Sequence, residues 1–376
     1  MGQRNLILFK EILRSYLKVK DRLKAVIFMG PLSSGGAEKQ ALLLAKTLND
    51  DLDITVVSFY GNVRLQRMVD FADQANVKVE YLFGSALKKV WGFHKLLGQL
   101  KPDAMFMYLP SNNLIGGLLG RLHGVKMLFG GVRTSRLPKF HYRILYVAHN
   151  FLNHVTIFNN HEGYRHLTEQ GFNADKGVVI HNCFHPFAEP IQRSESSPVT
   201  ILTCARFEHF KDYESAIAAI KLVKESTSTP FSYRIVGTGS MKNQVLAWIK
   251  ENGVGDVVDI IENPEDVDKH YREADIYFCS SNYEGLSNSV LEAMNRCLPI
   301  VSTKAGDHDR LAINNETGFL VEVGDRNAMA KHLVQLVEKF ELRQELGSNA
   351  YNLLVDNYSL GKFKSAYLDL IDRYKR

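Results

Sequence analysis

Two glutamates, Glu284 and Glu292, lie eight residues apart where an apolar strand-like segment gives way to a helical pattern. Gly285 allows a tight turn after Glu284, so Glu284 is expected in a loop and Glu292 in the helix. At 1.5 Å rise per residue their carboxylates are separated by roughly 10 Å, about the distance from the hexose to the ribose of a nucleotide sugar. The alternative is a solvated helix position for Glu292. Apolar residues at 290, 291, 293 and 294 disfavour it, because a carboxylate on a buried helix needs a partner.

The helix that carries Glu292 is expected to begin after Ser287, a good N-cap residue, and to run to about Cys297. The first backbone N–H groups of a helix lack intrahelical acceptors and lie at its positive dipole end. This end of the helix is therefore suited to bind phosphate or sugar hydroxyl groups.

Two cations follow another predicted strand in the segment TCARFEHFKDY, residues 203–213. Arg206 comes directly after the strand, and Lys211 lies five residues further on, before a predicted helix. A planar guanidinium and a compact ammonium on one loop can clamp a diphosphate. The alternative, ordinary surface charge, is equally compatible with these two residues taken alone.

Two glycine turns add further candidate ligand contacts. The segment IVGTGS places Gly237 and Gly239 between a predicted strand and a helix, but it lacks the third glycine of a dinucleotide fingerprint. Near the N-terminus, the strand at 24–30 leads into PLSSGGAEKQ, in which Gly35 and Gly36 let the backbone approach a ligand. Both turns are predicted to present a helix N-terminus to the site.

The elements that must position these residues alternate between strands and helices along the chain. Strands are predicted at 24–30, 54–60, 103–109, 126–132, 154–158, 199–205, 233–237, 257–261, 275–279, 299–303 and 318–323, and helices between them include 37–48 and 112–123. Such alternation predicts an α/β fold with two doubly wound, Rossmann-like parallel sheets that face each other across a cleft. Ligands bind at the carboxyl ends of such strands.

A proline- and serine-rich stretch separates the two series of strands. We expect an N-terminal domain at 1–185, a linker at 186–198 and a C-terminal domain at 199–357. Residues 358–376 are predicted to form a C-terminal helix that packs back on a domain surface, with the N-terminal domain as the candidate.

The segment from Glu284 through "EGLSNSVLEAM" into "PIVST" closely resembles the glutamate signature of the retaining GT-B glycosyltransferases of family four, the glycosyl transferases group 1. The resemblance implies that Glu284 and the backbone amides of Gly285, Leu286 and Ser287 hold the donor sugar, and that Glu292 binds the ribose. It also implies that Arg206 and Lys211 stabilise the departing nucleoside diphosphate. The turn at Gly237 and Gly239 then lines the nucleotide pocket, and the loop at Gly35 and Gly36 faces the donor phosphate and the acceptor. The resemblance thus implies that the domain at 1–185 is the acceptor side and that the domain at 199–357 binds the nucleotide sugar.

The chain departs from the family on the acceptor side. Many members carry a histidine after the strand that ends here at Gly131, whereas this chain reads GGVRTSR and places Arg133 and Thr134 there. Arg133 is predicted either to meet an anionic group of the acceptor or to form a structural salt bridge. No carboxylate pair and no His/Cys cluster has metal-ligand spacing, since His181 and His185 straddle a non-helical stretch, so we expect no metal and no cofactor.

Composition and charge limit the classes of partner that this protein is expected to bind. The formal net charge is +5, but residues 1–24 alone carry seven Lys/Arg and two Asp/Glu, so the remainder is nearly neutral and a nucleic-acid-binding face is not expected. Residues 5–19 read as a basic amphipathic helix that either lies on an anionic membrane or packs on the N-terminal domain. No secretory or membrane-spanning segment is evident, and four widely spaced cysteines fit a reducing cytoplasm.

These observations favour a cytoplasmic retaining glycosyltransferase that uses a UDP- or GDP-sugar. Its acceptor would be a glycan or a lipid-linked glycan, in cell-surface polysaccharide or lipopolysaccharide synthesis, the setting that the resemblance implies. A lipid-linked acceptor would suit a peripheral position at the inner face of the cell membrane. Two alternatives stay open at this point: a GT-B-fold nucleotide-sugar epimerase, which needs no acceptor, and a non-catalytic member that only binds nucleotide sugar.

Overall fold

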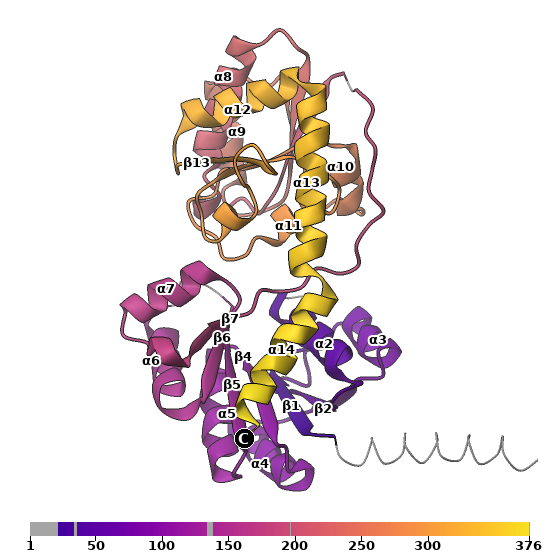
Figure 1. Ribbon diagram of the computed structural model, residues 1–376. Coiled ribbons are helices and arrows are strands. Elements are labelled where there is room, and N and C mark those ends of the chain that lie inside the picture. The colour runs from indigo at the N-terminus through magenta and orange to yellow at the C-terminus, as the bar shows by residue number, and fades with distance from the viewer. Residues whose placement is uncertain (1–21, 34–35, 134–137, 196, 376) are drawn as a thin grey trace, which may run out of the picture. The chain divides into compact units, whose positions relative to one another are not determined.

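The computed structural model describes residues 22–33, 36–133, 138–195 and 197–375, which fold into two compact units (Figure 1). The N-terminal unit contains the described residues up to Asn159, Tyr164–Ile180 and residues 364–375. The C-terminal unit contains Asn160–Gly163 and His181–Phe363. The predicted amphipathic helix at 5–19 lies outside the described residues. Within the described residues, no helix is both long enough and apolar enough to span a membrane.

The N-terminal unit is built on a seven-stranded parallel sheet with the order β3-β2-β1-β4-β5-β6-β7. Its central strands are buried on both faces, which is why their sequences read as continuous apolar runs. The strands are β1 Lys24–Met29, β2 Asp53–Ser58, β3 Lys78–Tyr81, β4 Ala104–Tyr108, β5 Met127–Val132, β6 Val155–Phe158 and β7 Gly177–Val179.

Helices cover this sheet and follow its strands in the chain. They are α2 Gly36–Leu48, α3 Gln66–Gln74, α4 Ala86–Leu100, α5 Pro110–Leu122, α6 Lys139–Val147 and α7 His161–Glu169, with a π-helical turn at Ala148–Leu152 and a 3-10 turn at Ala174–Lys176. The last helix, α14 Leu360–Tyr374, contributes Tyr367, whose ring lies 5.6 Å from that of Phe106 on β4. Residues 364–375 thus pack with the N-terminal unit.

The C-terminal unit repeats this plan with a six-stranded parallel sheet of order β10-β9-β8-β11-β12-β13. The strands are β8 Val199–Cys204, β9 Phe231–Val236, β10 Val258–Ile261, β11 Ile276–Cys279, β12 Ile300–Thr303 and β13 Gly318–Val321. The helices are α8 Tyr213–Ser226, α9 Lys242–Glu251, α10 Val267–Glu273, α11 Asn288–Met294, α12 Arg326–Glu338 and α13 Phe340–Tyr358. Two apolar clusters, one on each face of the sheet, form its core.

The α/β fold with two Rossmann-like sheets is confirmed, and each of the eleven predicted strands is present. Two short strands, β3 and β7, were not predicted. The helix after Ser287 is shorter than predicted, because α11 ends at Met294 and Cys297 has a left-handed φ of 54°. The linker has no helix or strand among its described residues, 186–195 and 197–198, but Arg193 donates hydrogen bonds to the carbonyls of Tyr271, Arg272 and Arg296. It therefore packs with the C-terminal unit.

Candidate functional site

The candidate site of the C-terminal unit lies at the carboxyl ends of β8, β9, β11 and β12. Strand order reverses between β8 and β11, because the chain runs outward from β8 through β9 and β10 and then returns to β11 on the other side. Loops at such a switch point diverge and leave room for a ligand. The loops after these two strands carry the predicted Lys211 and Glu284.

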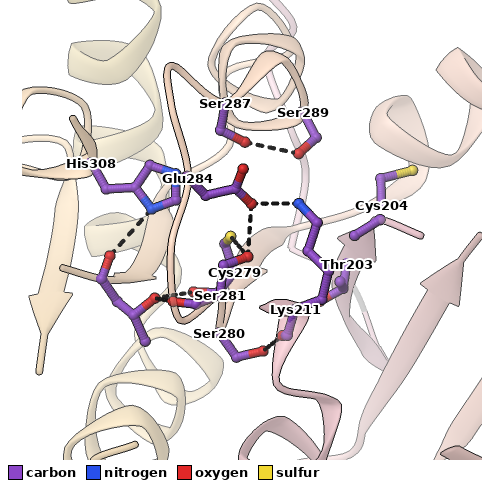
Figure 2. Close-up of polar contacts among 12 residues, drawn as sticks. Thr203, Cys204, Lys211, Cys279, Ser280, Ser281, Glu284, Ser287, Ser289 and His308 are labelled. Carbon is purple, nitrogen blue, oxygen red and sulfur yellow. Dashed lines mark hydrogen bonds and ion pairs between the residues drawn. The ribbon is translucent and has the colours of Figure 1, made fainter. Parts of the chain in front are cut away.

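Lys211 and Glu284 form an ion pair, although they are 73 residues apart in the chain (Figure 2). The same carboxylate oxygen, Oε1 of Glu284, also accepts a hydrogen bond of 2.8 Å from Ser281 Oγ. Each side chain of the pair is only 12% exposed, so solvent screens the pair less than it would a surface salt bridge. The two predicted residues are thus brought together by the fold.

Backbone contacts fix the two loops to each other. Ser280 Oγ donates to the carbonyl of Lys211 at 2.8 Å, and the Asn282 N–H donates to the carbonyl of Phe210 at 2.7 Å. Asp212 adopts a left-handed φ of 48° and accepts a hydrogen bond from the Ser215 N–H, which begins α8 directly after the loop. The loop after β8 therefore cannot shift independently of the loop after β11.

Arg206 lies on the same loop as Lys211 and is exposed. Its guanidinium carbon is 5.9 Å from the centre of the Phe210 ring, and Lys211 Nζ is 5.2 Å from that centre. Phe210 stacks on Tyr283 of the neighbouring loop at 5.1 Å. One aromatic ring thus adjoins both cations. Lys211 is paired with Glu284, whereas the side chain of Arg206 is exposed and can meet an anionic ligand.

The glycine turn after β9 is required for the packing of this loop. A Cβ atom at Gly237 would lie 1.9 Å from the carbonyl oxygen of Ala205, and one at Gly239 would lie 2.5 Å from that of Phe207. The Phe207 N–H also donates to the carbonyl of Thr238 at 2.9 Å. Gly237 and Gly239 therefore position the backbone on both sides of Arg206.

The remaining predicted donor residues surround the start of α11. Leu286 and Ser287 are buried. Ser287 occupies the N-cap position, but its side chain accepts no hydrogen bond from the helix backbone. Its hydroxyl oxygen instead lies 3.2 Å from that of Ser289. The backbone of Glu284 and Gly285 lies against the turn at Gly306, which adopts a φ of 62°. A Cβ atom at Gly306 would lie 2.6 Å from the Gly285 carbonyl oxygen, so only glycine fits.

Glu292 is partly buried on α11 and accepts a hydrogen bond of 2.9 Å from the hydroxyl of Tyr271. Tyr271 is buried and stacks on Tyr277. The Glu292 carboxylate thus has the kind of partner that a buried helix requires, the hydroxyl of a buried tyrosine, and the solvated-helix interpretation does not hold.

His308 is a neighbour of the ion pair that the sequence analysis missed (Figure 2). It is completely buried, and its Nδ1 lies 2.7 Å from the hydroxyl of Ser302. Burial lowers the pKa of His308, although the nearby Glu284 carboxylate favours the charged form. In the sequence, the one signal for His308 is its position shortly after the Ala305-Gly306 turn.

One cluster in the described part of the chain could hold a metal ion: His161, His181 and Asp307, with ligand atoms within 4.8 Å of one another. Hydrogen bonds already engage both oxygens of the Asp307 carboxylate. The backbone N–H groups of His161 and Glu162 donate to it at 2.8–3.0 Å, and His181 Nε2 lies 3.1 Å away. Asp307 therefore caps the first turn of α7. His185 does not belong to this cluster.

We expect Asp307→Asn to lower the free energy of unfolding by about 1–3 kcal/mol at neutral pH, because it removes these charge-assisted hydrogen bonds. Burial raises the pKa of Asp307, but hydrogen bonds from His181 and the two backbone N–H groups outweigh it and hold the pKa below its usual value. The stabilising contribution is therefore fully present above about pH 4 and is lost as the pH falls through the lower folded-state pKa.

The melting temperature should consequently fall more steeply below about pH 4 in the unmodified protein than in the Asp307→Asn variant. Thermal unfolding from pH 3 to 7 checks this. Asp309→Asn is the matched control, since Asp309 is exposed two residues away. Parallel pH curves for the Asp307→Asn variant and the unmodified protein would contradict the capping role.

The N-terminal unit contains the acceptor-side candidates. Gly36 is the first residue of α2, directly after the loop that follows β1, whereas Gly35 and Thr134 lie outside the described residues. The guanidinium carbon of Arg133 lies 4.4 Å from the centre of the Tyr108 ring, and Nη2 donates to the hydroxyl of Tyr367 at 3.4 Å. Both aromatic partners restrict where its charge can point.

Comparison with known proteins identifies the family. Residues 185–353 match the family model described as Glycosyl transferases group 1. The chain is 22% identical over 363 residues to the GalNAc-alpha-(1->4)-GalNAc-alpha-(1->3)-diNAcBac-PP-undecaprenol alpha-1,4-N-acetyl-D-galactosaminyltransferase of Campylobacter jejuni, covering 94% of this chain and 99% of the relative. Residues 185–353 therefore belong to the glycosyl transferases group 1.

Similarity to a further glycosyltransferase and to a solved structure extends over most of the chain. The chain is 22% identical over 343 residues to the capsular polysaccharide biosynthesis glycosyltransferase CapM of Staphylococcus aureus, covering 82% of this chain and 87% of the relative. HepE of Anabaena in complex with UDP matches it with a TM-score of 0.79 at 16% identity, over 93% of this chain and 100% of HepE. The GT-B fold and the family resemblance are thereby confirmed, and Lys211 and Glu284 lie within the matched span.

Proposed function

We propose that this group 1 glycosyltransferase retains the anomeric configuration of the sugar that it transfers. The donor would be a UDP- or GDP-sugar, and the acceptor a glycan or a lipid-linked glycan of cell-surface polysaccharide or lipopolysaccharide synthesis. The observation that carries this proposal is the largely buried ion pair of Lys211 and Glu284 at the switch point between β8 and β11. The relative from Campylobacter jejuni, whose acceptor carries PP-undecaprenol, supports a lipid-linked acceptor.

In the proposed reaction, Arg206 and Lys211 stabilise the negative charge that develops on the departing diphosphate. Preorganised cations of this kind lower the barrier because they need no reorganisation during bond cleavage. The Lys211 ammonium is already positioned by Glu284, and exposed Arg206 lies on the same loop. These residues would supply the charge that a metal ion supplies in other transferases.

We further propose front-face transfer. The bond between the anomeric carbon and the diphosphate oxygen breaks, the acceptor oxygen bonds to the same face of the sugar, and the departing diphosphate accepts the acceptor proton. Glu284 orients the sugar rather than attacking it, because Lys211 and Ser281 both donate to one of its carboxylate oxygens and reduce its nucleophilicity. NMR of the product anomer tests the stereochemistry, and an inverted product would rule this course out.

Nucleotide binding is tested by thermal shift of the purified protein with UDP, GDP, ADP and their common sugars, each with and without EDTA. One nucleotide family at 100 times its dissociation constant should stabilise the fold by about 2.7 kcal/mol, or roughly 5 °C or more, in the presence of EDTA. Glu292→Gln should weaken that shift, with Glu316→Gln as an exposed control. If none of these ligands stabilises the protein, it does not bind a donor on its own and the proposal fails.

A further inference from the structure

An exposed surface of the N-terminal unit has no role in the proposed donor site. It is formed by the loops that follow β2 and β3 and by the outer face of α4. Its side chains are apolar, aromatic or basic, and we refer to it as the α4 surface: Tyr60, Val63, Arg64, Phe83, Leu87, Lys88, Trp91 and Lys95.

Three large apolar side chains of the α4 surface are exposed to solvent over more than half of their area. Leu87 is 83% exposed, Trp91 59% and Phe83 53%. The opposite face of α4 is packed in the core, where Phe93 and Leu97 are completely buried. The helix is therefore apolar on two faces, and the fold covers only one of them, as is typical of an interaction site.

The two segments that form the α4 surface are basic. Residues 59–67 and 81–101 contain six Lys/Arg and neither Asp nor Glu. The ammonium of Lys95 lies 3.6 Å from the centre of the Trp91 ring, and that of Lys89 lies 4.3 Å from the centre of the Tyr60 ring. Cations and aromatic rings thus alternate over the α4 surface rather than forming separate patches.

We propose that the α4 surface docks on an anionic lipid bilayer. Leucine, phenylalanine and tryptophan enter the boundary between head groups and acyl chains, while lysines remain at the level of anionic head groups. The absence of acidic side chains from these two segments favours a bilayer of negative charge over a mixed-charge protein surface. This contact is separate from the one expected for residues 5–19.

The location of the α4 surface connects it to the predicted acceptor side. Within the N-terminal unit, the Leu32 N–H donates to the carbonyl of Val63 at 3.1 Å, and the Leu65 N–H donates to that of Leu32 at 2.9 Å. Leu32 belongs to the loop after β1, which leads to Gly36. A bilayer bound here would lie next to that loop, which suits a lipid-linked acceptor; in this respect the inference rests on the proposed function.

The test uses vesicles of phosphatidylcholine with and without phosphatidylglycerol, and no measurement of turnover. The chain has two tryptophans, so the full-length Trp248→Phe variant leaves Trp91 as the sole reporter. We expect its emission to shift to shorter wavelength with anionic vesicles, to be quenched by brominated acyl chains, and to return towards its original position at high salt.

In co-sedimentation, the variant Leu87→Ser/Lys88→Glu/Lys95→Glu should bind anionic vesicles about 10-fold more weakly or worse. Leu118→Ser/Leu122→Ser, which alters two exposed leucines on α5, is the matched control and should bind normally. Vesicle binding without a change in Trp91 emission would place the contact elsewhere, for example at residues 5–19, and overturn the proposal. So would no binding at low salt. Both results can occur while a nucleotide still raises the melting temperature as expected. Failure of the membrane proposal is therefore distinguishable from failure of the proposed function.

Discussion

Replacing Arg206 and Lys211 together with alanine is expected to lower turnover by about 10³-fold or more, because both proposed cations for the departing diphosphate are lost. The donor dissociation constant should rise less than turnover falls, since the charge that they stabilise develops during bond cleavage. Steady-state kinetics with the donor identified by thermal shift measures both effects.

The fold should survive this double substitution. Arg206 is exposed, so Arg206→Ala alone should change the free energy of unfolding by less than about 0.5 kcal/mol. Lys211→Ala removes the cation paired with the Glu284 carboxylate and should cost about 1–3 kcal/mol. Lys224→Ala, which breaks an exposed ion pair with Asp256, is the matched control and should leave turnover unchanged. Near-normal turnover in the double variant would refute the proposed mechanism.

Gly237→Ala should destabilise the C-terminal unit and also impair turnover. The new Cβ atom would lie 1.9 Å from the Ala205 carbonyl oxygen, and no side-chain rotation can relieve a clash between two backbone-fixed atoms. Relief requires the turn after β9 to move away from the loop that begins at Ala205. We expect a loss of about 1–3 kcal/mol or more in the free energy of unfolding, measured by urea denaturation.

The displaced loop carries Arg206, so turnover should fall in Gly237→Ala even at temperatures where the variant is fully folded. Gly255→Ala is the matched control. Gly255 is exposed, and its nearest neighbour to a new Cβ atom is a methyl group of Ile249 at 3.9 Å. That variant should retain both stability and turnover. Normal stability of the Gly237→Ala variant would contradict this prediction, because the turn would then accommodate a Cβ atom despite the close approach of Ala205.

Much of this protein can be read from local sequence. The central strands are continuous apolar runs, and strand–helix alternation with short connections permits few arrangements other than parallel sheets. The signature from Glu284 to Glu292 and the cations Arg206 and Lys211 were predicted for the same reason: each depends on residues close together in the chain. Strands β3 and β7 were missed because they are short and partly exposed, so they lack an apolar run.

Only the tertiary structure determined which distant residues meet. Lys211 and Glu284 are 73 positions apart, and the sequence carries no signal that their side chains form a pair, since that depends on β8 and β11 lying next to each other in the sheet. For the same reason, sequence could not supply Tyr271 as the partner of Glu292, or Tyr108 and Tyr367 as the partners of Arg133. Periodicity reflects contacts within one element, whereas a site at the carboxyl ends of a parallel sheet is assembled from loops that only strand order brings together.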